Sequence, residues 1–169
     1  ETDLRLAAAA FESQEAMMVT DAKGLIQRVN RAFCDLTGYT AEELRGQTPR
    51  LLKSGRHNAD FYIEMWKSIN STGGWQGEVW DKRKNGEVYP KWLSISAVKG
   101  EDGAVTHYIG THLDISERKK TEEIINDLAY FDQLTNLPNR TLLLDRLKQA
   151  MMASSRNESH GALLFIDLD

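Results

Sequence analysis

The stretch WQGEVWDKRKNGEVYPKWLSISAV, residues 75–98, decides the fold. Apolar and polar side chains alternate in its first part, residues 75–83, and alternate again from Trp92 onwards. Such alternation is typical of strands that bury one face. Between the two parts lies KNGE, residues 84–87, whose Asn-Gly pair favours a tight hairpin turn because both residues tolerate a positive φ. The stretch therefore predicts two antiparallel strands joined by a hairpin.

More strands are predicted on both sides of this hairpin. Downstream, the turn sequence GEDG at 100–103 leads into VTHYIGTHLDI at 105–115. Upstream, the short β-prone runs MMVTD at 17–21 and LIQRVN at 25–30 are separated by a turn that contains a glycine. The sequence thus predicts a five-stranded antiparallel sheet.

Helical patterns occupy the other parts of this first domain. Residues 1–16 contain an alanine-rich run of high helix propensity. Asn30 can cap a short helix at 31–37, and residues 40–46 contain the Thr-x-x-Glu spacing of a capping box. The longest amphipathic pattern covers 58–71, where apolar residues recur at steps of three and four. Together with the sheet, these helices predict an α+β domain with short helices on one face.

The chain becomes highly charged after Ile115. Within residues 117–131, Ile124, Leu128 and Phe131 are spaced four and three apart, as on a coiled-coil seam. A helix this short is marginal alone, and a second copy would cover its apolar side. We therefore expect a linker helix that forms a homodimer together with the first domain.

Residues 132–169 have the pattern of a different domain. DQLTNLPNR at 132–140 predicts a loop, TLLLDRLKQAMMASS at 141–155 an amphipathic helix, and ALLFIDLD at 162–169 a buried strand. Without neighbouring strands, this last element exposes apolar side chains and unpaired backbone groups. We expect it to be disordered or to pair with another chain, and a partner copy is the favoured occupant.

Composition and charge exclude several classes of function. The 169 residues carry a net charge of −4, with basic residues scattered among acids, which gives no general attraction to nucleic acid or anionic lipid. The single cysteine, Cys34, forms no internal disulfide, and no apolar run is long enough to cross a bilayer. These features predict a cytoplasmic segment without nucleic-acid or membrane contacts. The start at Glu1 indicates a segment cut from a longer protein.

Three segments resemble the PAS superfamily in their order and residues. NRAFCDLTGYTAEELRGQ at 30–47 is similar to the helical segment of that family, and residues 75–98 are similar to its central hairpin. YIGTHLDISERKK at 108–120 is similar to its last strand, which runs into a signalling helix. The resemblance implies a PAS sensor domain over residues 17–116.

The C-terminal segment resembles the start of the GGDEF-type diguanylate cyclases. FDQLTNLPNRTLLLDRL at 131–147 and LLFIDLD at 163–169 match that family in order and spacing, which implies a truncated, partial α/β cyclase segment over 132–169. The resemblance implies that Asp167 would hold Mg²⁺ in the intact cyclase, where GTP is the substrate. The guanine-binding segment and the Gly-Gly-[Asp/Glu]-Glu-Phe turn of the family do not occur in this sequence. We therefore expect the chain not to be an enzyme by itself.

The PAS resemblance also implies a ligand pocket between the inner face of the sheet and the helix at 58–71. The candidate cofactor-binding residues are Asn30, Trp66, Trp80 and His112. GTHLD at 110–114 resembles flavin-dependent redox PAS domains, so FMN or FAD is one expectation. Packing in the core and on the sheet face explains the tryptophans equally well, so a domain without a cofactor is the other.

Light-sensing flavin PAS domains carry a Gly-x-Asn-Cys-Arg-Phe-Leu-Gln stretch whose cysteine bonds to the flavin. The aligned GQTPRLLK at 46–53 has Pro49 in place of that cysteine, and Lys91 and His112 replace an asparagine and a glutamine of the subfamily. These residue types exclude photoadduct chemistry. Haem requires a strong axial ligand, usually a histidine on the long helix, and the helix at 58–71 contains none.

The triplet Asp114, Ile115 and Ser116 resembles the exit motif of the PAS family. A carboxylate at the start of a helix can accept backbone N–H groups and tie the helix to the sheet. A change on the sheet would then alter the position of the helix. A plain helix cap explains the same triplet equally well.

These features predict a sensory and regulatory PAS module that dimerises and controls a C-terminal diguanylate cyclase in cyclic di-GMP signalling. Synthesis joins two GTP molecules held by two cyclase domains, so the pairing of two helices can set the activity. Two alternatives stay open: a flavin-binding PAS domain that senses redox state, and a ligand-free structural dimerisation module.

Overall fold

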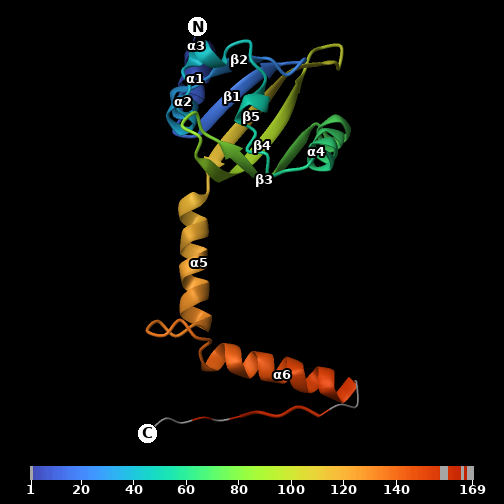
Figure 1. Cartoon of the computed structure of the whole chain (residues 1–169). Helices are drawn as coiled ribbons and strands as arrows, with labels where there is room; N and C mark the ends of the chain where they lie inside the picture. Colours follow the sequence, from blue (N-terminus) through green and yellow to red (C-terminus); the bar gives the residue numbers. More distant parts are fainter. Residues whose placement is uncertain (1, 157–159, 165, 167–169) are drawn as a thin grey trace. The chain divides into compact units, whose positions relative to one another are not determined.

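The hairpin expected at residues 75–98 consists of β3 (Gly74–Lys82) and β4 (Val88–Lys99), which pair antiparallel with Trp80 opposite Pro90. The sheet is completed by β1 (Ala16–Asp21), β2 (Ile26–Val29) and β5 (Val105–Asp114). Its strand order is β2-β1-β5-β4-β3, and each neighbouring pair is antiparallel. This confirms the predicted five-stranded α+β fold (Figure 1).

The structure is a computed structural model and describes residues 2–156, 160–164 and 166. The chain divides into two units, residues 1–117 and 118–169. The first unit contains the sheet with its helices, and the second contains most of the linker helix and the C-terminal segment.

Five helical elements belong to the first unit: α1 (Thr2–Phe11), α2 (Arg31–Thr37), α3 (Ala41–Leu44), the 3₁₀ helix η1 (Pro49–Leu52) and α4 (Ala59–Thr72). α2 packs against β1, α3 against β2 and α4 against β3. The predicted capping box is present, because Thr40 and Glu43 exchange side-chain-to-backbone hydrogen bonds. α1 ends at Phe11 rather than near residue 16, a turn covers residues 12–15, and Ala16 is the first residue of β1.

A cluster of the hydrophobic core of this unit lies where α2, α3 and η1 cover β1 and β2. It consists of Ala16, Met18, Ile26, Phe33, Leu44 and Leu52, all of them buried. Burying the methionine, isoleucine, phenylalanine and leucine side chains of this cluster contributes roughly 1.5–3 kcal/mol each relative to leaving them in water. This cluster holds one end of the helical layer firmly against the sheet, whereas α4 packs at the opposite edge, on β3.

Asn30 joins three segments of the first unit through its buried side chain. The side-chain oxygen accepts hydrogen bonds from the backbone N–H groups of Met17 and Phe33, at 2.9 and 3.0 Å. The side-chain nitrogen donates to the carbonyls of Phe11 and Glu15, at 2.8 and 2.7 Å. Asn30 thus caps α2, as predicted, and also fixes the chain between α1 and β1.

The second unit contains α5 (Ser116–Tyr130), apart from its first residues, and α6 (Arg140–Arg156). Asp132 shapes the turn between them by accepting the backbone N–H of Thr135 at 2.9 Å. Asn139 accepts the N–H of Leu142 at 3.1 Å and donates to the carbonyl of Ala129 at 2.9 Å, which ties the start of α6 to the end of α5.

The prediction of a strand at 162–169 is wrong for those of its residues that the structure describes, 162–164 and 166. Residues 160–164 and 166 have no regular secondary structure, and Leu164 and Ile166 are exposed. A strand needs a neighbour to pair its backbone groups, and this segment has none among the described residues. In the same described part of the chain, no helix combines the length and apolar character needed to cross a bilayer.

We predict that Asn30→Ala lowers the free energy of unfolding by about 2–4 kcal/mol, because it removes a helix cap and leaves buried backbone groups unpaired. Urea unfolding followed by circular dichroism measures this change. Asn58→Ala is the matched control, because Asn58 caps α4 with one hydrogen bond at an exposed site, and its loss costs about 1 kcal/mol. Equal losses in the two variants would contradict the joining role of Asn30.

Candidate functional site

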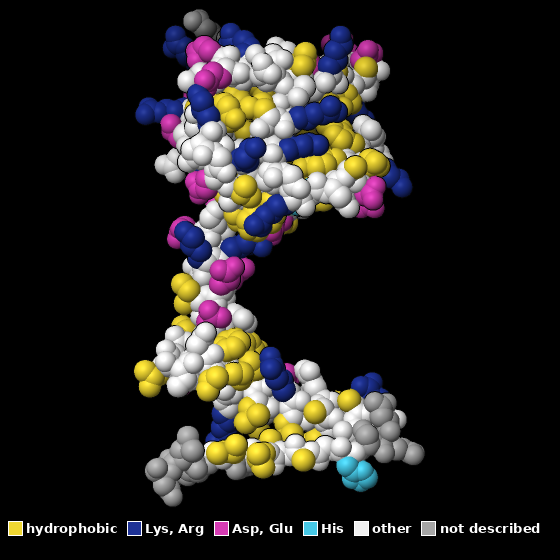
Figure 2. Space-filling view, viewed as in Figure 1, with side chains coloured by type: hydrophobic (Ala, Val, Ile, Leu, Met, Phe, Trp, Pro, Cys, Tyr) yellow, Lys and Arg dark blue, Asp and Glu magenta, His cyan; other side chains and the backbone are white. Residues whose placement is uncertain are grey.

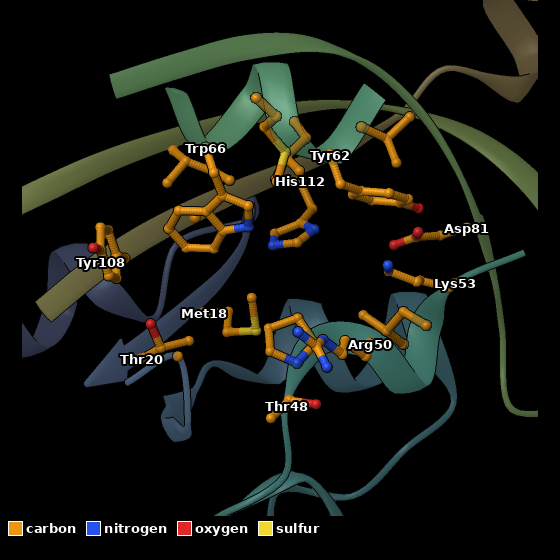
Figure 3. A pocket seen from close by; sticks show the side chains of 18 of the residues that line it. Met18, Thr20, Thr48, Arg50, Lys53, Tyr62, Trp66, Asp81, Tyr108 and His112 are labelled. Carbon is orange, nitrogen blue, oxygen red and sulfur yellow. The ribbon is translucent and has the colours of Figure 1, made fainter. Parts of the chain in front are cut away.

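A pocket of about 1200 Å³ lies between α4 and the inner face of the sheet (Figure 3). Strands β1, β3, β4 and β5 contribute side chains from one side, and α4 and residues 48–53 contribute them from the others. Most of the lining is apolar and includes Met18, Leu52, Met65, Val79, Leu93 and Ile95. The pocket is therefore suited to an apolar body with only a few polar contacts.

Three charged or titratable side chains meet at the floor of this pocket. Asp81, Lys91 and His112 come from the neighbouring strands β3, β4 and β5, and none is more than 6% exposed. The Lys91 ammonium forms an ion pair with the Asp81 carboxylate and lies 2.7 Å from His112 Nδ1. We refer to these residues as the buried triad.

The alternation of β4 explains why a lysine is buried here. Tyr89, Lys91 and Leu93 share the inner face, and the register places Lys91 opposite Val79 of β3 and Leu93 opposite His112 of β5. An unpaired ammonium in this position would be very costly. Asp81 supplies the opposite charge from the next strand, so the charge of Lys91 is paired.

Burial and charge control the ionisation of the triad. Burial lowers the pKa of Lys91, and the Asp81 carboxylate acts against this shift by favouring the ammonium. Burial and then the positive charge of Lys91 lower the pKa of His112 well below its ordinary value. The imidazole is therefore neutral at neutral pH, and its Nε2 atom is buried without a hydrogen-bond partner among the described residues.

Aromatic side chains border the pocket along α4 (Figure 3). Trp66 stacks edge-to-face on Tyr108 of β5, with ring centroids 5.2 Å apart. Tyr62 lies one turn earlier, and the Lys53 ammonium sits 3.6 Å from the centre of its ring. Trp66 is 39% exposed, so part of this aromatic border is open to solvent.

Two of the four predicted cofactor-binding residues line the pocket, namely Trp66 and His112. Asn30 does not, because its side chain is used in the backbone contacts of α2 and β1. Trp80 does not either: its indole N–H donates to Glu78 at 3.1 Å, and the Arg56 guanidinium lies over its ring. Trp80 occupies the other face of β3 from its neighbours Val79 and Asp81.

Pro49 and Lys91, which replace two residues of the light-sensing subfamily, also line the pocket. Cys34 does not line it and lies on α2. Sequence reasoning missed the role of Asp81. The signal that could have revealed it is the strand alternation, which places both Asp81 and Lys91 on the buried face, where a lone charge is rarely tolerated.

The predicted exit triplet forms a joint between the sheet and α5. Asp114 accepts the N–H of Ser116 at 2.8 Å and pairs with Arg83 from the end of β3, while the Ile115 N–H donates to the Pro90 carbonyl at 3.1 Å. Partial burial acts to raise the pKa of Asp114, but the hydrogen bonds from Ser116 and Arg83 outweigh it and lower the pKa.

Arg83 extends this joint to the helical layer. Its guanidinium also donates to the Leu36 carbonyl at the end of α2 and lies over the Tyr89 ring, 3.8 Å from the centroid. We call Arg83, Asp114, Ile115 and Ser116 the exit joint. The residue that holds this joint together, Arg83, was not among the predicted site residues.

Asp167, the predicted magnesium ligand of the intact cyclase, lies outside the described residues. Within the part of the chain that the structure describes, no group of three His, Cys, Asp or Glu side chains is arranged to hold a metal ion.

An antiparallel sheet with a helix-bordered pocket on one face and a helix leaving its last strand is the arrangement of a small sensor domain. The sequence comparison agrees. The chain belongs to the PAS domain family, whose profile matches residues 14–117. The profile of the diguanylate cyclase GGDEF domain matches residues 129–169, a short part of a cyclase.

Several characterised proteins are similar to this chain. A nitrogen fixation regulatory protein of Klebsiella oxytoca is 30% identical over 83% of the chain and 29% of its own length. A blue-light-activated histidine kinase of Rhizobium johnstonii is 32% identical over 70% of the chain and 36% of its own length. The cyclic di-GMP phosphodiesterase PdeR of Escherichia coli is 26% identical over 94% of the chain and 24% of its own length. The chain spans about a third or less of the length of these relatives. Its PAS and GGDEF matches, together with these regulatory relatives, support a role in signalling.

Solved structures share the fold. A PAS domain from Colwellia psychrerythraea is 26% identical with a TM-score of 0.65, covering 69% of this chain and 99% of that one. An RNA-binding light-oxygen-voltage receptor is 28% identical with a TM-score of 0.66, covering 75% of this chain and 37% of that one.

We predict that acidification destabilises the first unit through His112. In the unfolded chain a histidine takes up a proton near pH 6.5, whereas the buried imidazole, with its lowered pKa, does not. Below about pH 6.5 the unfolded state therefore binds more protons, and stability falls by up to about 1.4 kcal/mol per pH unit. Urea unfolding at about pH 7.5 and about pH 5.5 measures the loss.

His112→Gln should remove this part of the pH dependence, because glutamine does not titrate. His107→Gln is the matched control, since His107 is exposed on the same strand, and it should unfold with the pH dependence of the wild type. A pH dependence that survives His112→Gln unchanged would show that another group causes it.

Proposed function

We propose that this chain is a sensory module that dimerises through α5 and controls a diguanylate cyclase domain, of which the GGDEF segment at residues 129–169 is the first part. The observation that carries the proposal is that neighbouring residues of β4 belong to the pocket and contact the exit joint. Lys91 lines the pocket, while the carbonyl of Pro90, the adjacent residue, accepts the N–H of Ile115. A shift of Lys91 on ligand binding would thus reach the first turn of α5 within one residue.

The exposed side of α5 supports dimerisation. Ile124 and Leu128 are 59% and 56% exposed, and none of the described residues of this helix is buried after Ile115. These apolar side chains are in water on a highly charged helix. Pairing with a second helix would bury them, and this burial is favourable in free energy. Their spacing of four places them on one side of the helix, where a second copy of the helix would cover them. Phe131, the third residue of the predicted seam, lies just after the last residue of α5 and is half-buried.

Control by dimer geometry follows from the chemistry of cyclic di-GMP synthesis. Two GTP molecules held by two cyclase domains must face one another before they react. The helix pair that precedes the cyclase domains sets this geometry without contacting the substrate. A joint that fixes the first turn of α5 to the sheet is therefore in the position to pass a change in the sensor to the cyclase.

We expect Leu128→Glu to convert the chain from dimer to monomer, because it introduces a charge at the seam. Sedimentation equilibrium measures the mass. The same change in a chimera that continues into a complete GGDEF domain should lower cyclic di-GMP synthesis from GTP and Mg²⁺ at least roughly tenfold, since productive encounters are lost.

Leu134→Glu is the matched control for the mass measurement, because Leu134 is 93% exposed in the turn after α5 and outside the seam. Asp114→Asn should leave the dimer intact while changing the synthesis rate, because it weakens the exit joint only. A wild-type chain that stays monomeric at high micromolar concentration would refute the proposal.

A second candidate, a flavin-holding redox sensor, is favoured by the large aromatic-bordered pocket. Trp66 and Tyr62 would contact the flat ring, and His112 would face it from the sheet. The buried Nε2 of His112, which has no partner among the described residues, fits a ring that carries hydrogen-bond acceptors. When bound, a flavin supplies reversible one- or two-electron redox chemistry. No thiol lines the pocket among the described residues, which agrees with redox rather than photoadduct sensing.

This candidate predicts that the chain purified from flavin-supplemented cells is yellow, with the two visible and near-ultraviolet absorbance bands of an oxidised flavin that bleach on reduction. The absorbance spectrum before and after dithionite tests this. A colourless protein after flavin supplementation would reject the redox candidate and leave the dimerisation proposal unaffected.

A further inference from the structure

The segment between η1 and α4 contacts the outer edge of the sheet. We call residues 53–58 the connector, and they lie beside β3, the last strand in the sheet order. The Ser54 hydroxyl donates to the backbone carbonyl of Trp80, and the Trp80 N–H donates to His57 Nε2 at 2.8 Å. An edge strand directs such backbone groups away from the sheet, where another strand could pair with them. Two side chains of the connector therefore take the place of a neighbouring strand at Trp80.

Ring contacts join the connector to the start of α4 as well as to β3. The His57 ring stacks on Phe61, in the first turn of α4, with the ring centroids 4.0 Å apart. The Arg56 guanidinium lies 4.0 Å from the centre of the Trp80 ring. Because the same imidazole contacts Phe61 and accepts the Trp80 N–H, it ties the first turn of α4 to the edge of the sheet.

The hydrogen bond from Trp80 fixes the protonation state of His57. A backbone N–H is only a donor, so Nε2 must offer a lone pair, and the neutral ring then carries its hydrogen on Nδ1. When a proton binds to Nε2, two donors face each other and the hydrogen bond is lost. Histidine side chains ordinarily change charge between about pH 5 and about pH 8. His57 is only half-buried, so protons from the solvent can reach it.

No carboxylate among the described residues stabilises a proton on His57 through an ion pair. The charged and titratable groups on the elements packed against the ring are Arg56 of the connector, Asp60 and Tyr62 of α4, and Glu78 and Asp81 of β3. Asp81 is paired with Lys91, and Glu78 accepts the indole N–H of Trp80. The positive charge on a protonated ring therefore gains no ion-pair partner in this arrangement.

The chain around His57 already carries several positive charges. Arg50, Lys53 and Arg56 are all exposed, and Figure 2 shows basic side chains, in dark blue, across the visible face of the first unit. A proton on His57 adds a further positive charge beside Arg56, and like charges at short range repel each other. Protonation thus removes a hydrogen bond and adds repulsion, so both effects favour release of the connector.

We propose that the hydrogen bond between Trp80 and His57 is a pH-sensitive clasp, which holds the connector and the first turn of α4 on the edge of β3 and opens when the ring takes up a proton. The open state binds this proton and the closed state does not, so the closed state is lost as the pH falls. Lys53 and Tyr62, which contact each other at the border of the pocket, would lose their fixed positions on opening. The inference goes beyond the proposed function, because acidification then acts on this domain without any ligand.

Amide hydrogen exchange of Trp80 in the full chain measures the clasp directly. The exchange rate is divided by the intrinsic rate of an unstructured peptide at the same pH. The amide of Leu93, on β4 between β3 and β5, is the internal reference and reports unfolding of the whole first unit, including any acid effect of His112. The exchange of Trp80 relative to Leu93 should rise roughly tenfold between about pH 7.5 and about pH 5.5.

Three variants test the role of the imidazole. His57→Gln should keep the Trp80 amide protected at both pH values, because the glutamine carbonyl can accept the N–H and does not titrate. His57→Leu removes the acceptor, so the Trp80 amide should exchange roughly tenfold faster than in the wild type already at about pH 7.5. His107→Gln is the matched control, since His107 is exposed on β5, and it should keep the pH profile of the wild type.

A second measurement needs no variant: long-range proton–nitrogen correlation spectra should show the His57 ring neutral, with its hydrogen on Nδ1, at about pH 7.5. A neutral ring with its hydrogen on Nε2 would overturn the clasp. So would a Trp80 amide whose exchange relative to Leu93 does not change with pH, or one that stays fully protected in His57→Leu. None of these outcomes affects the mass measurements on the wild type and Leu128→Glu, which decide dimerisation separately.

Discussion

The ion pair between Lys91 and Asp81 is the constraint on which the first unit depends. An ammonium and a carboxylate that are both buried must meet, because either alone would be strongly destabilising. Their pairing sets the register of β3 against β4. A slip of β4 by one residue would turn Lys91 outward and bring Trp92, now 37% exposed on the other face, into the pocket. The charged pair therefore specifies one arrangement of the sheet at the point where the pocket is formed.

The same register places the pocket and the exit joint on consecutive residues. In the pairing of β4 with β5, Lys91 lies opposite Asp114, and Pro90 receives the N–H of Ile115. Tyr89, two residues before Lys91, is buried below the Arg83 guanidinium that pairs with Asp114. Burial, together with the charge of Asp81, raises the pKa of Tyr89, so its hydroxyl stays neutral in this network. The pocket and the start of α5 thus share one short segment of β4.

Much of this fold could be predicted from the sequence, because its signals are local. The Asn-Gly turn, the alternation along 75–98, the capping box before α3 and the helical spacing at 58–71 each act within a few residues. The pocket chemistry was less predictable, since it depends on which residues three separate strands bring together. His112 could be predicted as a site residue from its place in GTHLD. The role of Asp81 follows only from its ion pair with Lys91 on the next strand. The sequence predicts Asn30 as a pocket residue, because a buried asparagine and a ligand contact look alike in sequence.

The predicted strand near the C-terminus differs from the successful predictions in one physical respect. A helix such as α6 satisfies its backbone groups internally, so it can form without the rest of its domain. A strand satisfies them only through neighbours, and residues 160–164 have none in the described part of the chain. The apolar side chains Leu143 and Leu144 of α6, and Leu163 and Leu164, are consequently left exposed. The second unit therefore carries the local elements of a cyclase domain without its long-range ones. In the proposed function, the sensor acts on catalysis by positioning the domain attached after α5, and the exit joint is the part of the first unit that contacts the start of α5.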